Sequence, residues 1–218
     1  MIKIIKDAAG SMFPLTQQDI GEFEVMKGRG AQFHTEVFDA EGAGSLCVME
    51  MKAAAGVMRM ETGVFSPTQL DGPIFSFDYI KAAGKETLFL ELYDTTLSHP
   101  DFAQLSEVKD KYAHVPELDP GAHWYDSMRL SVSDYKKGRK IKKDAYSMMH
   151  DYSEMYFRIL AGSDTCNAEE KKTRNGKFAR GLLDNGGPAV DTFRKMVGDE
   201  RTEEFLMEYM FCGRSDKK

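Results

Sequence analysis

Short apolar runs that alternate with polar residues fill the first 95 positions of the chain. They are rich in aromatic and aliphatic side chains and cover residues 22–26, 32–38, 46–51, 57–64, 74–80 and 87–93. Gly, Pro or Asp separates them, and period-two alternation bounded by turn residues is typical of β-strands. Because strands joined by short links pair most simply as a meander, the pattern predicts one antiparallel sheet.

After Tyr93 the apolar spacing changes to three and four residues, which is typical of amphipathic helices. The pattern predicts helices over residues 100–112, 143–160, 188–197 and 202–211. Pro188 suits a first helical turn, and Gly198 suits a helix end. Since helices must bury their apolar stripes, we expect them on both faces of the sheet. The predicted fold is α+β, a three-layer α/β/α sandwich with a central antiparallel sheet, in one domain spanning residues 1–218.

Composition narrows the classes of partner and compartment. The net charge is −6, from 35 acidic and 29 basic residues, which argues against nucleic acid as the main partner. No apolar run reaches the length of a membrane span, and the first residues lack the apolar region of a secretory leader. Cys47, Cys166 and Cys212 form no CxxC pair and are typical of reduced thiols. We expect a cytoplasmic monomer, or a protein of the plastid stroma if the source is eukaryotic.

Motifs for the common cofactors are missing from the sequence. No strand is followed by GxGxxG, and neither GxxxxGK[ST], HExxH nor a His/Cys cluster occurs. The GxSxG motif of serine hydrolases is also missing. We therefore expect no metal and no bound cofactor, so that an enzyme of this sequence would take its redox partner from outside the chain.

Acidic residues inside apolar strands are the least expected feature of the chain. Asp78 lies among aromatic residues in the run 74–80, and Glu50 and Glu61 lie in the two preceding predicted strands. Such acids can simply occupy a water-facing side of a strand. If helices cover both faces, however, Asp78 cannot be fully solvated, and a buried charge is costly unless it is paired or protonated. A carboxyl in an apolar site can donate a proton near neutral pH.

Residues 47–94 resemble the ferredoxin-dependent bilin reductases, which reduce open-chain tetrapyrroles such as biliverdin. The resemblance rests on the strand at 48–51, the strand end at 64–67, the Gly-Pro-Ile-Phe-Ser-Phe-Asp run at 72–78 and the strand at 88–94. Residues 185–200 and 205–211 are similar to the closing pair of helices in that family. The resemblance implies an α/β/α sandwich that holds no redox cofactor and receives electrons from a reduced [2Fe-2S] ferredoxin.

The resemblance also implies roles for individual residues. Asp78 matches the central catalytic aspartate of the family, and Glu50 matches a glutamate that some members use in vinyl-group reduction. Thr62 stands where certain members have a catalytic His, which favours a phycoerythrobilin-type product over phycocyanobilin. We expect both acids in one apolar slot beside the pigment. The expected substrate-binding residues are Thr62, Phe65, Phe75, Phe77, Arg59, Asp184 and Asn185.

A cluster of basic residues lies in the segment 136–143. Its members are Lys136, Lys137, Arg139, Lys140, Lys142 and Lys143. In a net-acidic protein this run can steer an acidic partner, and it lacks the interleaved aromatic residues of a nucleic-acid site. We expect ferredoxin to dock here, with a solvated loop as the alternative.

Together these features predict an enzyme that reduces biliverdin IXα to a phycobilin by sequential electron transfer and site-specific protonation. Two alternatives stay open. One is a reductase of a chlorophyll-derived open-chain tetrapyrrole, and the other is a non-catalytic bilin carrier. The two strand acids favour catalysis, because a carrier needs no buried proton donor.

Overall fold

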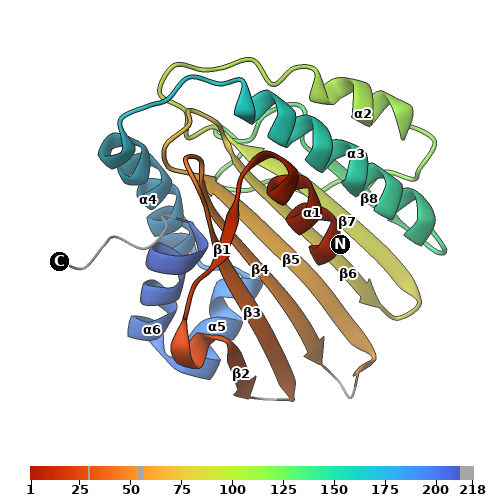
Figure 1. Ribbon diagram of the computed structural model, residues 1–218. Coiled ribbons are helices and arrows are strands. Elements are labelled where there is room, and N and C mark those ends of the chain that lie inside the picture. Colours follow the sequence, from red (N-terminus) through yellow and green to blue (C-terminus); the bar gives the residue numbers. More distant parts are fainter. Residues whose placement is uncertain (29, 54–55, 212–218) are drawn as a thin grey trace.

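The centre of the protein is an antiparallel sheet, which the computed structural model describes with eight strands among residues 1–28, 30–53 and 56–211 (Figure 1). The strand order is β1-β3-β4-β5-β6-β7-β8, and β2 also pairs with β3. The strands are β1 (Leu15–Gln17), β2 (Val25–Gly28), β3 (Ala31–Ala40), β4 (Gly44–Ala53), β5 (Met58–Pro67), β6 (Ile74–Ala82), β7 (Lys85–Tyr93) and β8 (Asp134–Gly138). From β3 to β7 each strand pairs with the next, which confirms the predicted meander.

One face of the sheet, here called the α3 face, is covered by α1 (Ile2–Met12), α2 (Leu105–Lys111) and α3 (Lys142–Ala161) (Figure 1). Its core is aromatic: Phe65 and Phe75 from the sheet pack against Tyr156 and Phe157 of α3, and all four are fully buried. Each such side chain contributes roughly 1.5–3 kcal/mol when it leaves water. This face therefore holds much of the stabilising core.

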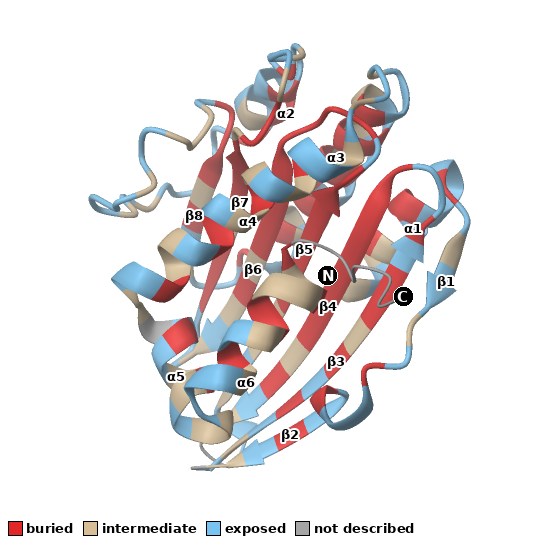
Figure 2. Ribbon diagram, turned by 90° about the vertical axis from the view of Figure 1, so that its left-hand side faces the viewer, coloured by how far each residue is buried: buried red, intermediate tan, exposed pale blue. Residues whose placement is uncertain are grey.

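The opposite face, here called the α4 face, is covered by α4 (Ala168–Asn185), α5 (Pro188–Val197), α6 (Asp199–Glu204) and a π-helical turn, η3 (Phe205–Met210). A 3₁₀ turn, η1 (Gly21–Phe23), adds Phe23 to the same core. Helix α5 packs on β2, and η3 packs on β4 and β5. The α/β/α sandwich predicted from the sequence is confirmed, and Figure 2 shows the buried residues concentrated in the strands between the two helical layers.

Helices α1 and α4 are absent from the sequence prediction. Residues 168–185 are strongly polar, and two positions on the inner side of α4 carry Lys171 and Asn175, both fully buried, where an apolar residue would reveal the helical period. The apolar pattern does not predict α1, because charged residues interrupt its short apolar stretch. No helix in the described ranges has the length and apolar character needed to cross a bilayer.

The cysteines lie apart from one another. Cys47 is buried in β4, and burial raises the pKa of its thiol to about 12. Cys166 is partly exposed before α4, and Cys212 lies outside the described residues. Among the residues that the structure describes, no group of His, Cys, Asp and Glu is arranged to hold a metal ion.

Candidate functional site

The register of the strands decides which side chains face which helical layer. Asp78 on β6 pairs with Thr62 on β5, and Thr62 in turn pairs with Met49 on β4. Directly paired residues point to the same side of a sheet. Asp78, Thr62 and Met49 therefore all face the α4 side.

Glu50 points to the α3 face, because it follows Met49 in the strand and pairs with Glu61. Its side chain is 40% exposed, and its carboxylate lies 3.1 Å from the Lys52 ammonium. The prediction that Glu50 and Asp78 share one apolar slot is wrong. A difference of one residue in register moves a side chain to the other side of the sheet. Met49 therefore occupies the position next to Thr62 that was expected for Glu50.

Four of the expected substrate-binding residues also lie on the α3 face. Phe65 pairs with Phe75, Gly63 pairs with Phe77, and Arg59 pairs with Lys81. These pairs lie on the same face of the sheet as Glu61, which is opposite to the face of Asp78. The three phenylalanines are buried in the core under α3. The prediction that Phe65, Phe75, Phe77 and Arg59 line a pocket beside Asp78 is therefore wrong. On this face Glu61 is bound by the α-amino group of Met1, at 2.7 Å.

Asp184 and Asn185 are exposed at the C-terminal end of α4. The Asn185 amide donates to the carbonyl of Gly181 at 2.9 Å, and Asp184 lines an open groove between α4 and η3. The structure thus places both outside the group of side chains around Asp78.

Asp78 has the environment of a proton donor. Its carboxylate accepts a hydrogen bond from the Thr62 hydroxyl, and the residue is half-buried. Burial raises the pKa of Asp78 to about 6, the Thr62 hydrogen bond lowers it in part, and the charge of Glu91 adds to the rise. Half-buried apolar side chains on the same face surround it, namely Met60, Ile80 and Phe89. The carboxyl can therefore hold a proton near neutral pH next to an apolar surface.

Glu91 is the second acid on this face, and sequence reasoning missed it. It pairs with Ser76 on β6 and is 7% exposed. The Tyr93 hydroxyl donates to one of its oxygens at 2.7 Å, and the Tyr135 hydroxyl donates to the other at 3.0 Å. The sequence shows that Phe89, Glu91 and Tyr93 share one parity of β7, but only the structure shows that Phe89 pairs with Asp78.

A cation lies beside this pair of acids. The guanidinium of Arg129 stacks on the ring of Tyr135 at 5.4 Å and forms an ion pair with Asp126 at 3.1 Å. The Arg129 side chain is 18% exposed, and its buried Nη1 has no hydrogen-bond partner within the described part of the chain. Because Nη1 is buried, a carboxylate from solvent can reach only the exposed part of this side chain. Arg129 lies in a loop without apolar periodicity, so no pattern in the sequence points to it.

The loop that carries Arg129 is held against α4 by its aromatic residues. The Trp124 ring lies 5.7 Å from the ring of Phe178 on α4, and the Tyr125 ring lies 5.3 Å from that of Tyr93. A Cβ at Gly181 would come within 2.3 Å of the Trp124 ring, so the glycine permits this close approach. The loop therefore joins the acid cluster on β6 and β7 to the α4 layer.

Comparison with known proteins identifies the fold. No protein-family model and no curated protein sequence matches the chain, whereas solved structures do. One of them is phytochromobilin synthase from tomato, crystallised in complex with biliverdin, with a TM-score of 0.71 and 12% sequence identity. The alignment covers 94% of this chain and 79% of that one. The chain has the fold of phytochromobilin synthase.

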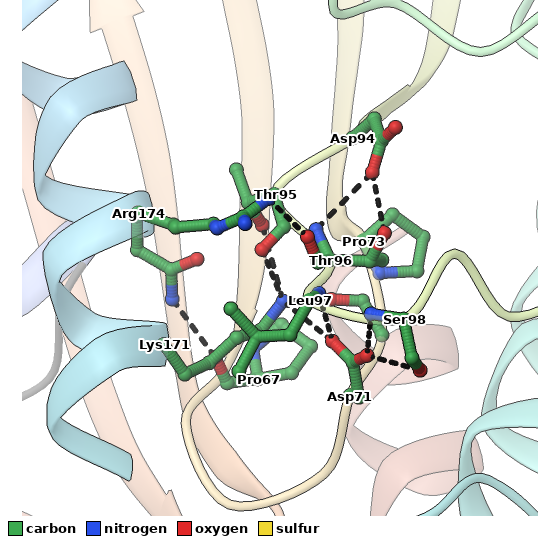
Figure 3. A network of polar contacts seen from close by, with 12 residues as sticks. Pro67, Asp71, Pro73, Asp94, Thr95, Thr96, Leu97, Ser98, Lys171 and Arg174 are labelled. Atoms are coloured by element: carbon green, nitrogen blue, oxygen red, sulfur yellow. Dashed lines mark hydrogen bonds and ion pairs between the residues drawn. The ribbon is translucent and has the colours of Figure 1, made fainter. Parts of the chain in front are cut away.

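Within this phytochromobilin synthase fold, a buried polar network ties α4 to the sheet (Figure 3). The Lys171 ammonium donates to the carbonyls of Gly72 and Thr95 and lies 3.6 Å from the Asp71 carboxylate. Arg174 donates to the carbonyl of Thr96 at 2.6 Å. These loops lead into β6 and out of β7, so the network fixes the strands that carry Asp78 and Glu91.

Replacing Lys171 by Ala is expected to lower the free energy of unfolding by about 3 kcal/mol, because it removes one partner of a buried ionic network. Burial lowers the pKa of Lys171 to about 8, which reflects how fully the ammonium is removed from water. Urea denaturation measures the change. Lys172→Ala is the matched control on the next position of α4, and a loss of similar size in both variants would contradict a specific role for Lys171.

The basic run is only partly on the surface. Lys136 is 1% exposed and lies between Asp134, at 3.3 Å, and Glu117, at 3.6 Å, so its assignment to a docking surface is wrong. The other members, Lys137, Arg139, Lys140, Lys142 and Lys143, are exposed. The β6–β7 turn adds the exposed Lys85, since its neighbour Glu86 pairs with Gly138 of β8. These six exposed residues are here called the basic edge.

Proposed function

We propose that the protein is a ferredoxin-dependent reductase of a linear tetrapyrrole, with biliverdin IXα as substrate and a phycoerythrobilin-type phycobilin as product. The observation that carries the proposal is Asp78, a half-buried acid with a pKa of about 6 on an apolar sheet face. The same fold occurs in phytochromobilin synthase, which was solved with biliverdin. The resemblance of residues 72–78 to the bilin reductases independently singles out this aspartate.

Asp78 would supply protons in this reaction. Each double bond that is lost from the pigment takes up two electrons and two protons, and the electrons arrive one at a time from reduced ferredoxin. A positioned acid whose pKa lies near the working pH gives typically a 10²–10⁴-fold acceleration. Thr62 orients the carboxylate of Asp78 through its hydroxyl, where a histidine would add a second titrating group. The phycoerythrobilin-type product is proposed because, in the family that the sequence resembles, members without a histidine at this position tend to make such products.

The face around Asp78 suits a large flat pigment. Met60, Ile80 and Phe89 offer an apolar platform that is only half-buried, and the partly exposed side chain of Arg129 offers a positive charge for a propionate. Arg59, one of the expected substrate-binding residues, lies on the opposite face. The platform and the cation together distinguish one face of the sheet as the binding side.

An anaerobic assay tests the proposal directly. The protein is mixed with biliverdin, reduced ferredoxin and a reducing system, and the products are separated by chromatography. Binding is followed through Trp124, the one tryptophan of the chain, because a bilin absorbs where tryptophan emits. Conversion to a phycobilin supports the proposal. Binding without conversion would identify a carrier, and conversion only of a chlorophyll-derived open-chain tetrapyrrole would identify a different reductase.

The basic edge is the proposed docking surface for ferredoxin. Reversing the charge of Arg139, Lys140 and Lys143 is expected to slow turnover about 10-fold at low ionic strength and to flatten its salt dependence, because steering of an acidic partner is lost. Stopped-flow kinetics over a salt series measure both effects. Reversing Lys172, Lys177 and Arg180 on α4 is the matched control, and equal slowing by the two triple variants would exclude the basic edge.

A further inference from the structure

Glu91 is buried beside the proposed proton donor and has no part in the reaction as described so far. It lies on the same sheet face as Asp78, two residues along β7 from Phe89, which pairs with Asp78. Diagonal cross-strand neighbours of this kind are roughly 7–8 Å apart. A second acid at this distance, in a half-buried site, acts on the first one through its charge.

Two tyrosines hold the Glu91 carboxylate in place. Tyr93 comes from the same strand and Tyr135 comes from β8, and each donates to a different oxygen of Glu91. The two hydroxyls compensate the carboxylate for the water that it loses on burial. The ring of Tyr135 also contacts that of Phe89 edge to face, at 5.7 Å between centroids. The arrangement is thus continuous from Tyr135 through Phe89 to the position of Asp78.

We propose that Glu91, fixed by Tyr93 and Tyr135, is a positioning residue that keeps the catalytic proton on Asp78 until the pigment takes it. The proposal rests on the bilin reductase function proposed above and adds the group that sets the pH range of that function. Glu91 acts through Asp78 and needs no contact with the substrate.

The groups that face Asp78 and Glu91 come from several elements. They are Thr62 on β5, Tyr93 on β7, Tyr135 and the exposed Lys137 on β8, and His123, Tyr125, Asp126 and Arg129 in the loop before β8. Arg129 stacks on Tyr135 and is also paired with Asp126. The charge of Glu91 raises the pKa of Asp78, in addition to the larger effect of burial.

The neutral variant Glu91→Gln therefore releases the proton of Asp78 at lower pH. Above pH 6 a smaller fraction of Asp78 remains protonated in the variant than in the native protein, whereas at pH 4 both are largely protonated. Since, well above the pKa, a shift of one pKa unit is a tenfold change in the protonated fraction, turnover at pH 7.5 is expected to fall about three- to tenfold, with little change at pH 4. A merely structural role would lower turnover equally at all pH values.

Two measurements on the full chain test the inference. The first is the pH profile of kcat/KM with biliverdin and reduced ferredoxin. The second is the titration of the Asp78 carboxyl in the free protein, followed by its infrared C=O band, with Asp78→Asn to assign the band. Glu91→Gln is expected to move both midpoints downward by about 0.5–1 pH unit. Tyr135→Phe, which keeps the charge and loses one hydrogen bond, is expected to move them less.

Glu86→Gln is the matched control, because Glu86 is a buried acid on the same strand that faces the opposite side of the sheet. It is expected to leave both midpoints unchanged. Unmoved midpoints in Glu91→Gln, or equal shifts in Glu86→Gln, would overturn the inference. If the native protein does not reduce bilins, the proposed function fails, and the infrared titration still decides whether Glu91 controls Asp78.

Discussion

Asp78→Asn is expected to lower bilin turnover by about 100- to 10,000-fold, the range that a positioned proton donor contributes. The amide keeps the shape of the side chain and can still accept the Thr62 hydrogen bond, but it has no proton to give. Binding of biliverdin, measured by quenching of Trp124 fluorescence, is expected to change little. Single-turnover kinetics with prereduced ferredoxin separate the lost protonation from electron delivery.

The native pH profile is part of the same prediction. Because the pKa of Asp78 is about 6, the protonated donor is abundant below that value and declines tenfold per pH unit above it. Turnover is therefore expected to fall on the alkaline side with a midpoint near 6. Asp78→Asn should abolish this limb of the profile, and normal turnover by the variant would refute the assignment.

Glu50→Gln is the control for this experiment. The sequence analysis assigned both Glu50 and Asp78 to catalysis, but Glu50 lies on the α3 face in an exposed ion pair with Lys52. Such exposed pairs contribute little to stability, so the variant is expected to fold and to turn over normally. A loss with Glu50→Gln as large as that with Asp78→Asn would contradict the division of the two acids between the faces.

Stability provides a check that Asp78→Asn is folded. A carboxyl whose pKa is raised on folding binds its proton more tightly in the native state than in the unfolded state. Ionisation of this carboxyl therefore lowers the free energy of unfolding. This cost is absent below the unfolded pKa and grows as the pH rises through about 6. The Asn variant avoids the cost, and its thermal midpoint at pH 7.5 is expected to be no lower than that of the native protein.

The sequence predicted the sandwich because its two strongest signals, period-two strands and period-three-and-four helices, are local. The local pattern does not reveal α4, because Lys171 and Asn175 are polar residues at buried positions of this helix. Their hydrogen-bond partners are the carbonyls of Gly72, Thr95 and Pro67. Those partners are 76 to 108 residues distant in the chain. A window of the sequence cannot show that such polar groups are satisfied.

Register explains the errors in the candidate site. Asp78 and Thr62 face the same side because they pair directly; Asp78 was selected by the strand pattern and by the family resemblance, and Thr62 by the resemblance alone. Met49, and not the adjacent Glu50, pairs with Thr62 on the face of Asp78. Successive residues of a strand point to opposite faces of the sheet, so Glu50 faces the other side. Glu91 could be found once its parity with Asp78 was known. Parity across strands depends on hairpin geometry, which alternation within one strand does not fix.

Arg129→Met is expected to raise the dissociation constant for biliverdin about 10- to 100-fold, because a hydrogen bond between charged groups contributes roughly 1.5–3 kcal/mol. The group that would be lost is the guanidinium of Arg129, whose side chain is 18% exposed. Methionine keeps much of the length that packs on Tyr135 and removes the charge. Titration of Trp124 fluorescence measures the change in affinity.

A comparison of two ligands isolates the carboxylate in this prediction. Biliverdin dimethyl ester lacks the propionate charges, so the native protein is expected to bind it about 10- to 100-fold more weakly than biliverdin. Arg129→Met should discriminate far less between the ester and the free acid, because the cation that recognises the charge is gone. Arg59→Met, on the α3 face, should keep the native discrimination. If Arg129→Met also kept it, the propionate would be bound elsewhere, and the pigment would lie across β5 to β7 without contact to the loop before β8.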